Sequence, residues 1–122
     1  MSNFWILSGV LSCALCVMIG AFGAHSLKDV LTEYGRGIYD KANLYHFMHS
    51  LALIINGILQ KLFIDLNFNL SGYLFLTGIV LFSISLYILA ITDIKILGAI
   101  TPFGGIFFIL GWLYIALQIY NN

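Results

Sequence analysis

The three histidines of this sequence have the side chains that could take part in the widest range of chemistry. His46 and His49 are three positions apart, so a helix would place both rings on one face, and His25 follows the first long apolar run. Ionisable groups within apolar segments are costly to bury and are therefore functional candidates. They could ligate a metal or haem, handle a proton or a substrate, or form interhelical hydrogen bonds. We favour hydrogen bonding, because no Asp, Glu or thiolate is evident at that depth to complete a metal shell.

Other polar residues are expected to lie at a similar depth. With a rise of about 1.5 Å per residue, several of them fall within about 10 Å of one membrane face. We predict a functional polar tier there, formed by His25, His49, Ser85, Tyr87 and Thr101. The tier would be weaker if Ser83 and Ser85 bond back to carbonyls of their own helix.

Cys13 and Cys16 have the C-x-x-C spacing of thioredoxin-like redox sites. Both fall in the middle of an apolar run, where burial makes a thiol inert. We therefore interpret them as two small buried hydrophobic residues.

The composition predicts a membrane protein. Of the 122 residues, 61% are hydrophobic and 8% are charged, whereas soluble domains carry about 25% charged residues. Five Lys and Arg balance five Asp and Glu, which leaves no basic stripe for a nucleic acid. No Ser-His-Asp arrangement or phosphate-binding loop is evident, so we predict no enzyme, no cofactor and no metal site.

Four runs without charged residues approach the length of about 20 residues that crosses the hydrocarbon core. These expected spans are residues 4–24, 42–60, 70–92 and 96–120. The runs are apolar all round, whereas strands of a barrel alternate. We predict an all-α integral membrane protein, a four-transmembrane-helix bundle, in a single domain of residues 1–122. The first run is expected to stay in the mature protein, because no basic residue precedes it as in a signal peptide.

The first loop, residues 25–43, contains apolar residues at helical spacing. We expect a short amphipathic helix on the membrane surface, ending near Gly35 or Gly37, with a solvated connector as the alternative. Its apolar face would consist of Leu27, Val30, Leu31, Tyr34 and Ile38.

Small residues recur at every fourth position of the first run. Because close approach and interhelical hydrogen bonds drive helix association in lipid, we predict that they form a packing seam. The predicted seam consists of Ser8, Ser12, Cys16, Gly20 and Ala24.

Pro102 predicts a break in the last helix, because proline lacks an N–H donor and clashes with the preceding turn. The helix could begin at Pro102 with Thr101 as N-cap, or run from Ile96 with a kink. We favour a broken or kinked start.

The positive charges predict the orientation. Lys28, Arg36 and Lys41 lie in the first loop and Lys95 in the third, whereas Lys61 is alone on the other face. The more basic loops usually stay in the cytoplasm, so both termini are expected outside.

Four motifs carry a resemblance to a known family. They are GAFGAHSLK at 20–28, HSLAL at 49–53, LFSISLY at 81–87 and GAITPFGGIFFILGW at 98–112. The chain resembles, over nearly its whole length, the small bacterial inner-membrane family called domain of unknown function 423, which is related to the eukaryotic transmembrane protein 256. The resemblance implies a four-helix protein of the bacterial cytoplasmic membrane, without an assigned activity.

The chain also departs from the family pattern. Members of the family usually read HGLK where this chain has Ser26 after His25, and we expect glutamine where His46 stands. The C-x-x-C pair is likewise no part of the pattern. These departures argue against a metal site or a redox site common to the family.

Two functions are considered. The leading one is a structural or accessory subunit that docks onto a larger membrane complex, such as a respiratory complex, or binds lipid. The alternative is a small oligomeric transporter or channel that uses the polar tier, with a helix broken at Pro102 as its supporting feature. The expected partners are the lipid bilayer and either a larger complex or further copies of the chain.

Overall fold

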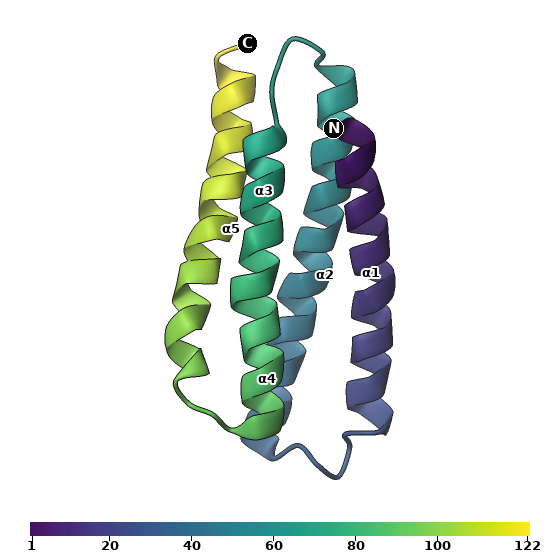
Figure 1. The fold of residues 1–122 in the computed structure, drawn as a ribbon, viewed down its shortest axis with the longest axis vertical. Helices are drawn as coiled ribbons and strands as arrows, with labels where there is room; N and C mark the ends of the chain where they lie inside the picture. Colours follow the sequence, from purple (N-terminus) through teal and green to yellow (C-terminus); the bar gives the residue numbers. More distant parts are fainter.

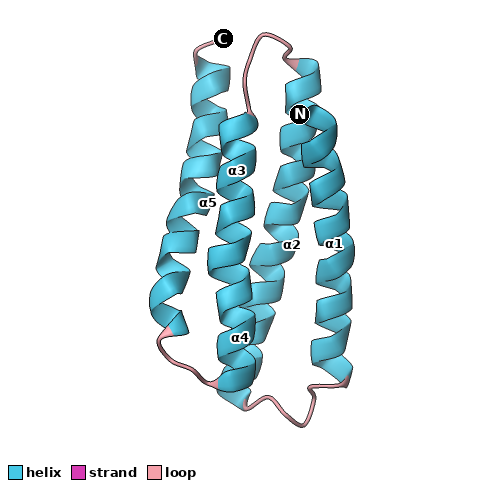
Figure 2. Ribbon diagram, in the orientation of Figure 1, coloured by secondary structure: helices cyan, strands magenta, loops and turns pink.

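The computed structural model describes residues 1–122 and is entirely helical (Figures 1 and 2). Its elements are α1 (Ser2–His25), α2 (Glu33–Leu62), α3 (Asn69–Gly78), the π-helical segment η1 (Ile79–Ile84), α4 (Ser85–Thr92) and α5 (Leu97–Tyr120). The segments α3, η1 and α4 join end to end into one rod, Asn69–Thr92, so the chain forms four long helices.

Three of these helices are long and apolar enough to cross a membrane: Ser2–His25, Asn69–Thr92 and Leu97–Tyr120. They cover the predicted spans 4–24 and 70–92 and all but the first residue of 96–120, because the charged residues that bound those runs lie beyond the helix ends.

The fourth helix, α2, is more polar and longer than expected. It begins at Glu33 rather than near residue 42 and has 30 residues. At about 1.5 Å per residue it is about 45 Å long, which exceeds a hydrocarbon core of about 30 Å. The two histidines, Asn56 and Gln60 lower its hydropathy.

The helices are arranged in a row rather than as a closed bundle. The first helix, α1, packs along α2; α2 also contacts α3, η1 and α4; and α5 packs on α3, η1 and α4. Figure 1 shows the resulting order, with both termini at one end and residues 26–32 and 93–96 at the other. The α2 helix and the α3–η1–α4 rod therefore lie inside the row, and α1 and α5 flank them.

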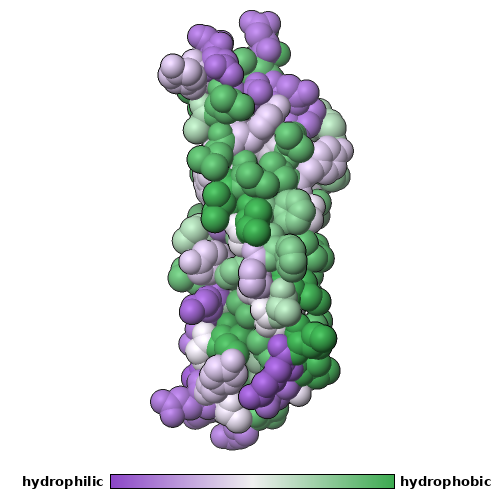
Figure 3. Space-filling model, turned by 90° about the vertical axis from the view of Figure 1, so that its left-hand side faces the viewer, coloured by the Kyte–Doolittle hydropathy of each residue, from purple (hydrophilic) through white to green (hydrophobic).

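Two apolar clusters form the core. One contains Trp5, Phe68 and Phe75, and the other contains Tyr39 and Leu86. Large hydrophobic side chains are also exposed along every helix. Figure 3 shows hydrophobic side chains over the middle of the molecule and hydrophilic ones gathered at its two ends, as expected for a surface that faces lipid.

The separate amphipathic helix predicted in the first loop is not found. Residues 26–32 form turns, and the Thr32 side chain accepts a hydrogen bond from the Gly35 N–H (2.9 Å), which starts α2 at Glu33. Leu27 and Leu31 are buried in the second core cluster. These two leucines cover the end of the helix row, which accounts for their apolar spacing. The Thr32 cap begins a new helix only after them.

The last helix runs through Pro102 without interruption and begins at Leu97. Thr101 is not an N-cap, because it lies inside α5, where its hydroxyl oxygen is 3.2 Å from the Leu97 carbonyl oxygen. Pro102 is the sixth residue of α5 and lies beyond the first four positions, whose N–H groups have no helical partner. It therefore leaves the Gly98 carbonyl without its i+4 donor.

Candidate functional site

The residues of the predicted polar tier lie in separate places. His25 is exposed at the end of α1. Ser85 and Thr101 form a hydrogen-bonded pair between α4 and α5 (2.9 Å), and Ser85 also donates back to the Leu81 carbonyl (2.6 Å). Tyr87 faces α2 and α1, and His49 faces α5.

Tyr87 belongs to a polar network that joins α1, α2 and α4. Its hydroxyl lies 3.0 Å from His46 Nδ1 and 3.1 Å from Asn43 Nδ2. His46 Nε2 lies 3.0 Å from Ser12 Oγ, which is 2.6 Å from Ser50 Oγ. These hydrogen bonds between side chains connect three helices.

The hydrogens of this network can be placed by elimination. Ser50 uses its proton to donate to the His46 carbonyl (2.7 Å), so Ser12 must donate to Ser50. Ser12 Oγ then accepts from His46 Nε2–H, which leaves His46 Nδ1 to accept from the Tyr87 hydroxyl. Tyr87 in turn accepts from the Asn43 amide. In its neutral form His46 therefore carries its proton on Nε2.

His49 has the opposite tautomer. Its Nδ1 donates to the Tyr45 carbonyl (2.9 Å), and its Nε2 accepts from the Trp112 indole N–H (3.1 Å). The ring also stacks on Phe108 with centroids 3.5 Å apart. This pair of bonds links α2 to α5, and it is a contact that the sequence analysis missed.

Both ring nitrogens of His46 and of His49 are thus occupied by protein groups. A metal would have to displace one of these hydrogen bonds, and no group of three or more His, Cys, Asp and Glu side chains is close enough to hold an ion. The arrangement makes both histidines interhelical linkers, the interpretation favoured from the sequence.

The predicted seam is placed as follows. Ser12 and Cys16 contact α2, where the Cys16 thiol donates to the Asn43 carbonyl (3.3 Å), and a Cβ built on Gly20 would meet the Asn43 side chain. Ser8 is half-buried and Ala24 is exposed. A strict repeat of four drifts around a helix of 3.6 residues per turn, so the α1 contact also uses positions outside the repeat. These further buried positions are Trp5, Gly9 and Gly23.

A further polar cluster lies at the end of the molecule that holds the termini. Asn56 donates to the Phe68 carbonyl (2.9 Å), and Gln60 both donates to Leu66 (2.6 Å) and accepts from Phe68 N–H (2.7 Å). Along α2, helical intervals of three or four residues join Asn43, His46 and Ser50, and a further interval of four joins Asn56 and Gln60. These polar residues of α2 were the available sequence signal for the network around His46 and for the cluster of Asn56 and Gln60.

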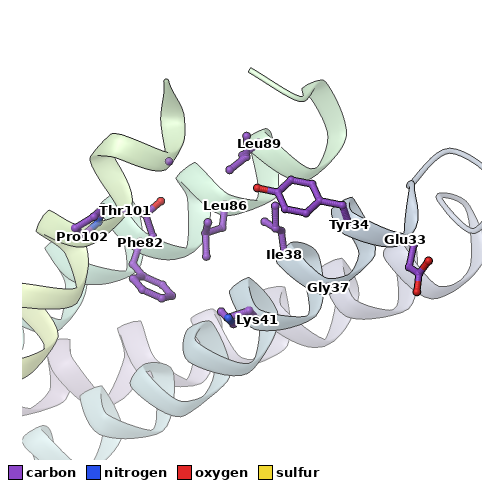
Figure 4. A pocket seen from close by; sticks show the side chains of 11 residues that line it. Glu33, Tyr34, Gly37, Ile38, Lys41, Phe82, Leu86, Leu89, Thr101 and Pro102 are labelled. Atoms are coloured by element: carbon purple, nitrogen blue, oxygen red, sulfur yellow. The ribbon is translucent and has the colours of Figure 1, made fainter. Parts of the chain in front are cut away.

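The largest hollow lies between α2 and α5, at the end opposite the termini (Figure 4). It has a volume of about 670 Å³. One wall consists of successive turns of α2, the other of the start of α5, and α4 with the end of η1 forms the floor. Its lining residues are Glu33, Tyr34, Gly37, Ile38, Lys41, Phe82, Leu86, Leu89, Gly98, Thr101 and Pro102.

A second hollow of about 360 Å³ adjoins the first at Phe82, which lines both. It continues along the next turns of the same two helices. On α2 it extends from Tyr45 to His49, and on α5 from Gly105 to Trp112. We call the two hollows together the α2–α5 groove. Its first part has polar residues at its rim, and its second part is lined largely by aromatic and apolar side chains.

Comparison with known proteins assigns the chain to a family. Residues 19–105 match the family described as Protein of unknown function (DUF423). The chain belongs to the DUF423 family. No solved structure matches it.

Its relatives include the UPF0382 membrane proteins of staphylococci. The Staphylococcus epidermidis protein is 44% identical over 113 residues, 93% of this chain and 92% of that relative. The Staphylococcus haemolyticus protein is 44% identical over 119 residues, 98% of this chain and 97% of that relative. These names, together with the apolar helices, show that this DUF423 protein is a multi-pass membrane protein. They state no enzymatic activity.

The network around His46 generates a stability prediction for this DUF423 protein. Tyr87→Phe removes the donor to the buried His46 Nδ1 and the acceptor of the half-buried Asn43 amide, so two groups lose a partner. We expect a loss of about 1–2 kcal/mol in the free energy of unfolding, measured by circular dichroism in mixed micelles. Tyr34→Phe, at an exposed tyrosine, is the control. Equal stability of the two variants would contradict the network.

Proposed function

We propose that this DUF423 protein is a four-span protein of the bacterial cytoplasmic membrane that binds a membrane lipid in the α2–α5 groove. The observation that carries the proposal is the hollow of about 670 Å³, which combines apolar walls with a polar rim. Ligand sites are typically concave and mostly apolar, with a few polar groups that orient the ligand.

The surface of α2 supports its assignment as the fourth span. Between residues 43 and 59 every exposed side chain of this helix is apolar: Leu44, Phe47, Met48, Leu51, Ile55 and Ile58. The polar residues of the same stretch are buried or half-buried and hydrogen-bonded to neighbouring helices. The helix thus presents an apolar face to lipid, although its mean hydropathy is lowered by groups that lipid does not contact.

The distribution of basic residues supports the orientation. Lys28, Arg36, Lys41 and Lys95 lie at the end of the molecule that holds the groove rim, and Lys61 lies at the end that holds both termini. With the basic end in the cytoplasm, both termini are outside.

This orientation predicts the behaviour of a fusion protein. A reporter that is active only in the cytoplasm should be inactive when fused after Asn122, and a reporter that requires export should be active there. The reverse pair of activities would contradict the orientation, whereas it would leave the helices and the groove unchanged.

The groove then opens at the cytoplasmic interface of the membrane. The segment Ala42–Leu62 of α2 is about 30 Å long, enough to cross the hydrocarbon core, and Glu33–Lys41 extends beyond it. The rim of the first hollow therefore lies at headgroup depth, and the second hollow lies among the acyl chains.

We favour lipid binding over docking onto a larger complex, because the groove is a specific feature, whereas the exposed apolar faces of α1 and α5 are accounted for by lipid alone. We propose no transport. The histidine hydrogen bonds are closed within the protein, and α5 is continuous through Pro102.

Filling the groove tests the proposal. A Cβ built on Gly37 meets nothing within 4 Å, so Gly37→Trp adds an indole on the wall of the first hollow without a backbone clash. We expect the fraction of protein that retains lipid in native mass spectrometry to fall about fivefold or more. Gly37→Ala is the matched control and should retain lipid like the wild type. Equal lipid retention in the Trp and Ala variants would overturn the proposal.

A further inference from the structure

We infer that the lipid in the α2–α5 groove is an anionic phospholipid, with its phosphate beside Lys41 and an acyl chain in the second hollow. This inference rests on the proposed function and adds to it the class of lipid and its direction in the groove.

Lys41 is placed to select the headgroup. It lines the first hollow, as Figure 4 shows, and among the basic residues at this end it lies furthest along α2 towards the membrane. Arg36 instead donates to the Lys28 carbonyl (2.7 Å), and neither of these residues lines the hollow. Lys41 thus places a positive charge at the boundary between headgroups and hydrocarbon, the depth of a lipid phosphate.

The acidic residue of the hollow does not oppose this charge. Glu33 lies two helical turns before Lys41 on α2, about 12 Å further from the hydrocarbon core. In Figure 4 its carboxylate points away from the centre of the hollow. An anion beside Lys41 therefore avoids the one carboxylate of the rim.

The start of α5 offers acceptors to a headgroup. Gly98 and Thr101 line the same hollow, and Pro102 leaves the Gly98 carbonyl without its i+4 donor. Headgroup hydroxyl or amine groups can donate to such a carbonyl, while the phosphate lies beside the ammonium of Lys41.

The second hollow fits the chain of the same lipid. It starts one turn beyond Lys41, at Tyr45 and Gly105, and continues to Trp112. The distance from Pro102 to Trp112 along α5 is about 15 Å. The hydrogen bond from Trp112 to His49 closes its far end, so an acyl chain that enters beside Lys41 ends against the Trp112 indole.

Trp112 can therefore report on the occupant. The chain has two tryptophans; Trp5 is fully buried, whereas Trp112 is 39% exposed. The experiment uses the full chain with Trp5→Phe, in phosphatidylcholine vesicles that contain phosphatidylglycerol. Brominated acyl chains, placed in either lipid in turn, quench Trp112 at short range. The protein that retains Trp5 is measured in parallel, because Trp5→Phe removes the hydrogen bond from Trp5 to Asn69 and can lower the stability of the protein.

We expect Trp112 to be quenched by phosphatidylglycerol about fivefold more strongly than its share of the bilayer predicts. Lys41→Gln should reduce this preference to about one, and Lys41→Arg should restore it. Lys28→Gln, which removes the same charge at the same end but outside the groove, should retain the preference.

The inference is overturned if both lipids quench in proportion to their share, or if Lys28→Gln lowers the preference as much as Lys41→Gln. Failure of the inference and failure of the proposed function are distinguishable. Gly37→Phe fills the same wall of the groove without adding a tryptophan. If Gly37→Phe reduces quenching by both lipids equally, a lipid occupies the groove without selection by charge, and only the inference fails. If Gly37→Phe does not change the quenching and Gly37→Trp does not change lipid retention in native mass spectrometry, the proposed function fails as well.

Discussion

Hydrocarbon supplies no hydrogen-bond partner, so a polar group within a membrane span is costly unless it finds a partner inside the protein. In this chain the constraint falls mainly on α2, which contains Asn43, His46, His49, Ser50 and Asn56. The structure meets the constraint by placing α2 inside the row of helices, where α1, α4 and α5 supply partners on different sides. The directions of these bonds fix opposite tautomers for two histidines only three residues apart. The position of each neighbouring helix therefore depends on a polar residue of α2.

The same arrangement creates the α2–α5 groove. Because α2 and α5 both pack on the α3–η1–α4 rod, they leave a hollow above its Phe82 and Leu86, and the bond between Trp112 and His49 closes one end. At the other end α2 continues to Glu33, and in the proposed membrane placement this extension brings Lys41 to the headgroup region. The hydrogen bonds of the histidines and the groove in which we propose that a lipid binds are thus two results of one packing arrangement.

The all-helical class and three helices of membrane-spanning length could be predicted from the sequence, because charged residues bound the apolar runs and hydrocarbon fixes the length of a span. The predicted surface helix was wrong, since the apolar periodicity of Leu27 and Leu31 does not show that Thr32 starts a new helix after them. The prediction of the polar tier used only the depth of each residue in the membrane. Depth brought Ser85 and Thr101 together correctly, but it did not give the rotation about each helix axis, which turns Tyr87 towards α1 and α2 and His49 towards α5. Trp112 and the groove depend on that rotation and had no signal in the local sequence.

The central claim is that α2 crosses the membrane as a fourth span despite its polar residues. Two exposed aspartates, Asp29 and Asp65, lie in the loops at its opposite ends and offer matched positions for a single cysteine. In a background of Cys13→Ala and Cys16→Ser, a membrane-impermeant maleimide applied to intact cells tests the claim most directly. The account predicts that Asp65→Cys is labelled and that Asp29→Cys is labelled only after permeabilisation. Labelling of both positions in intact cells, or of neither, would place the two loops on one side and contradict it.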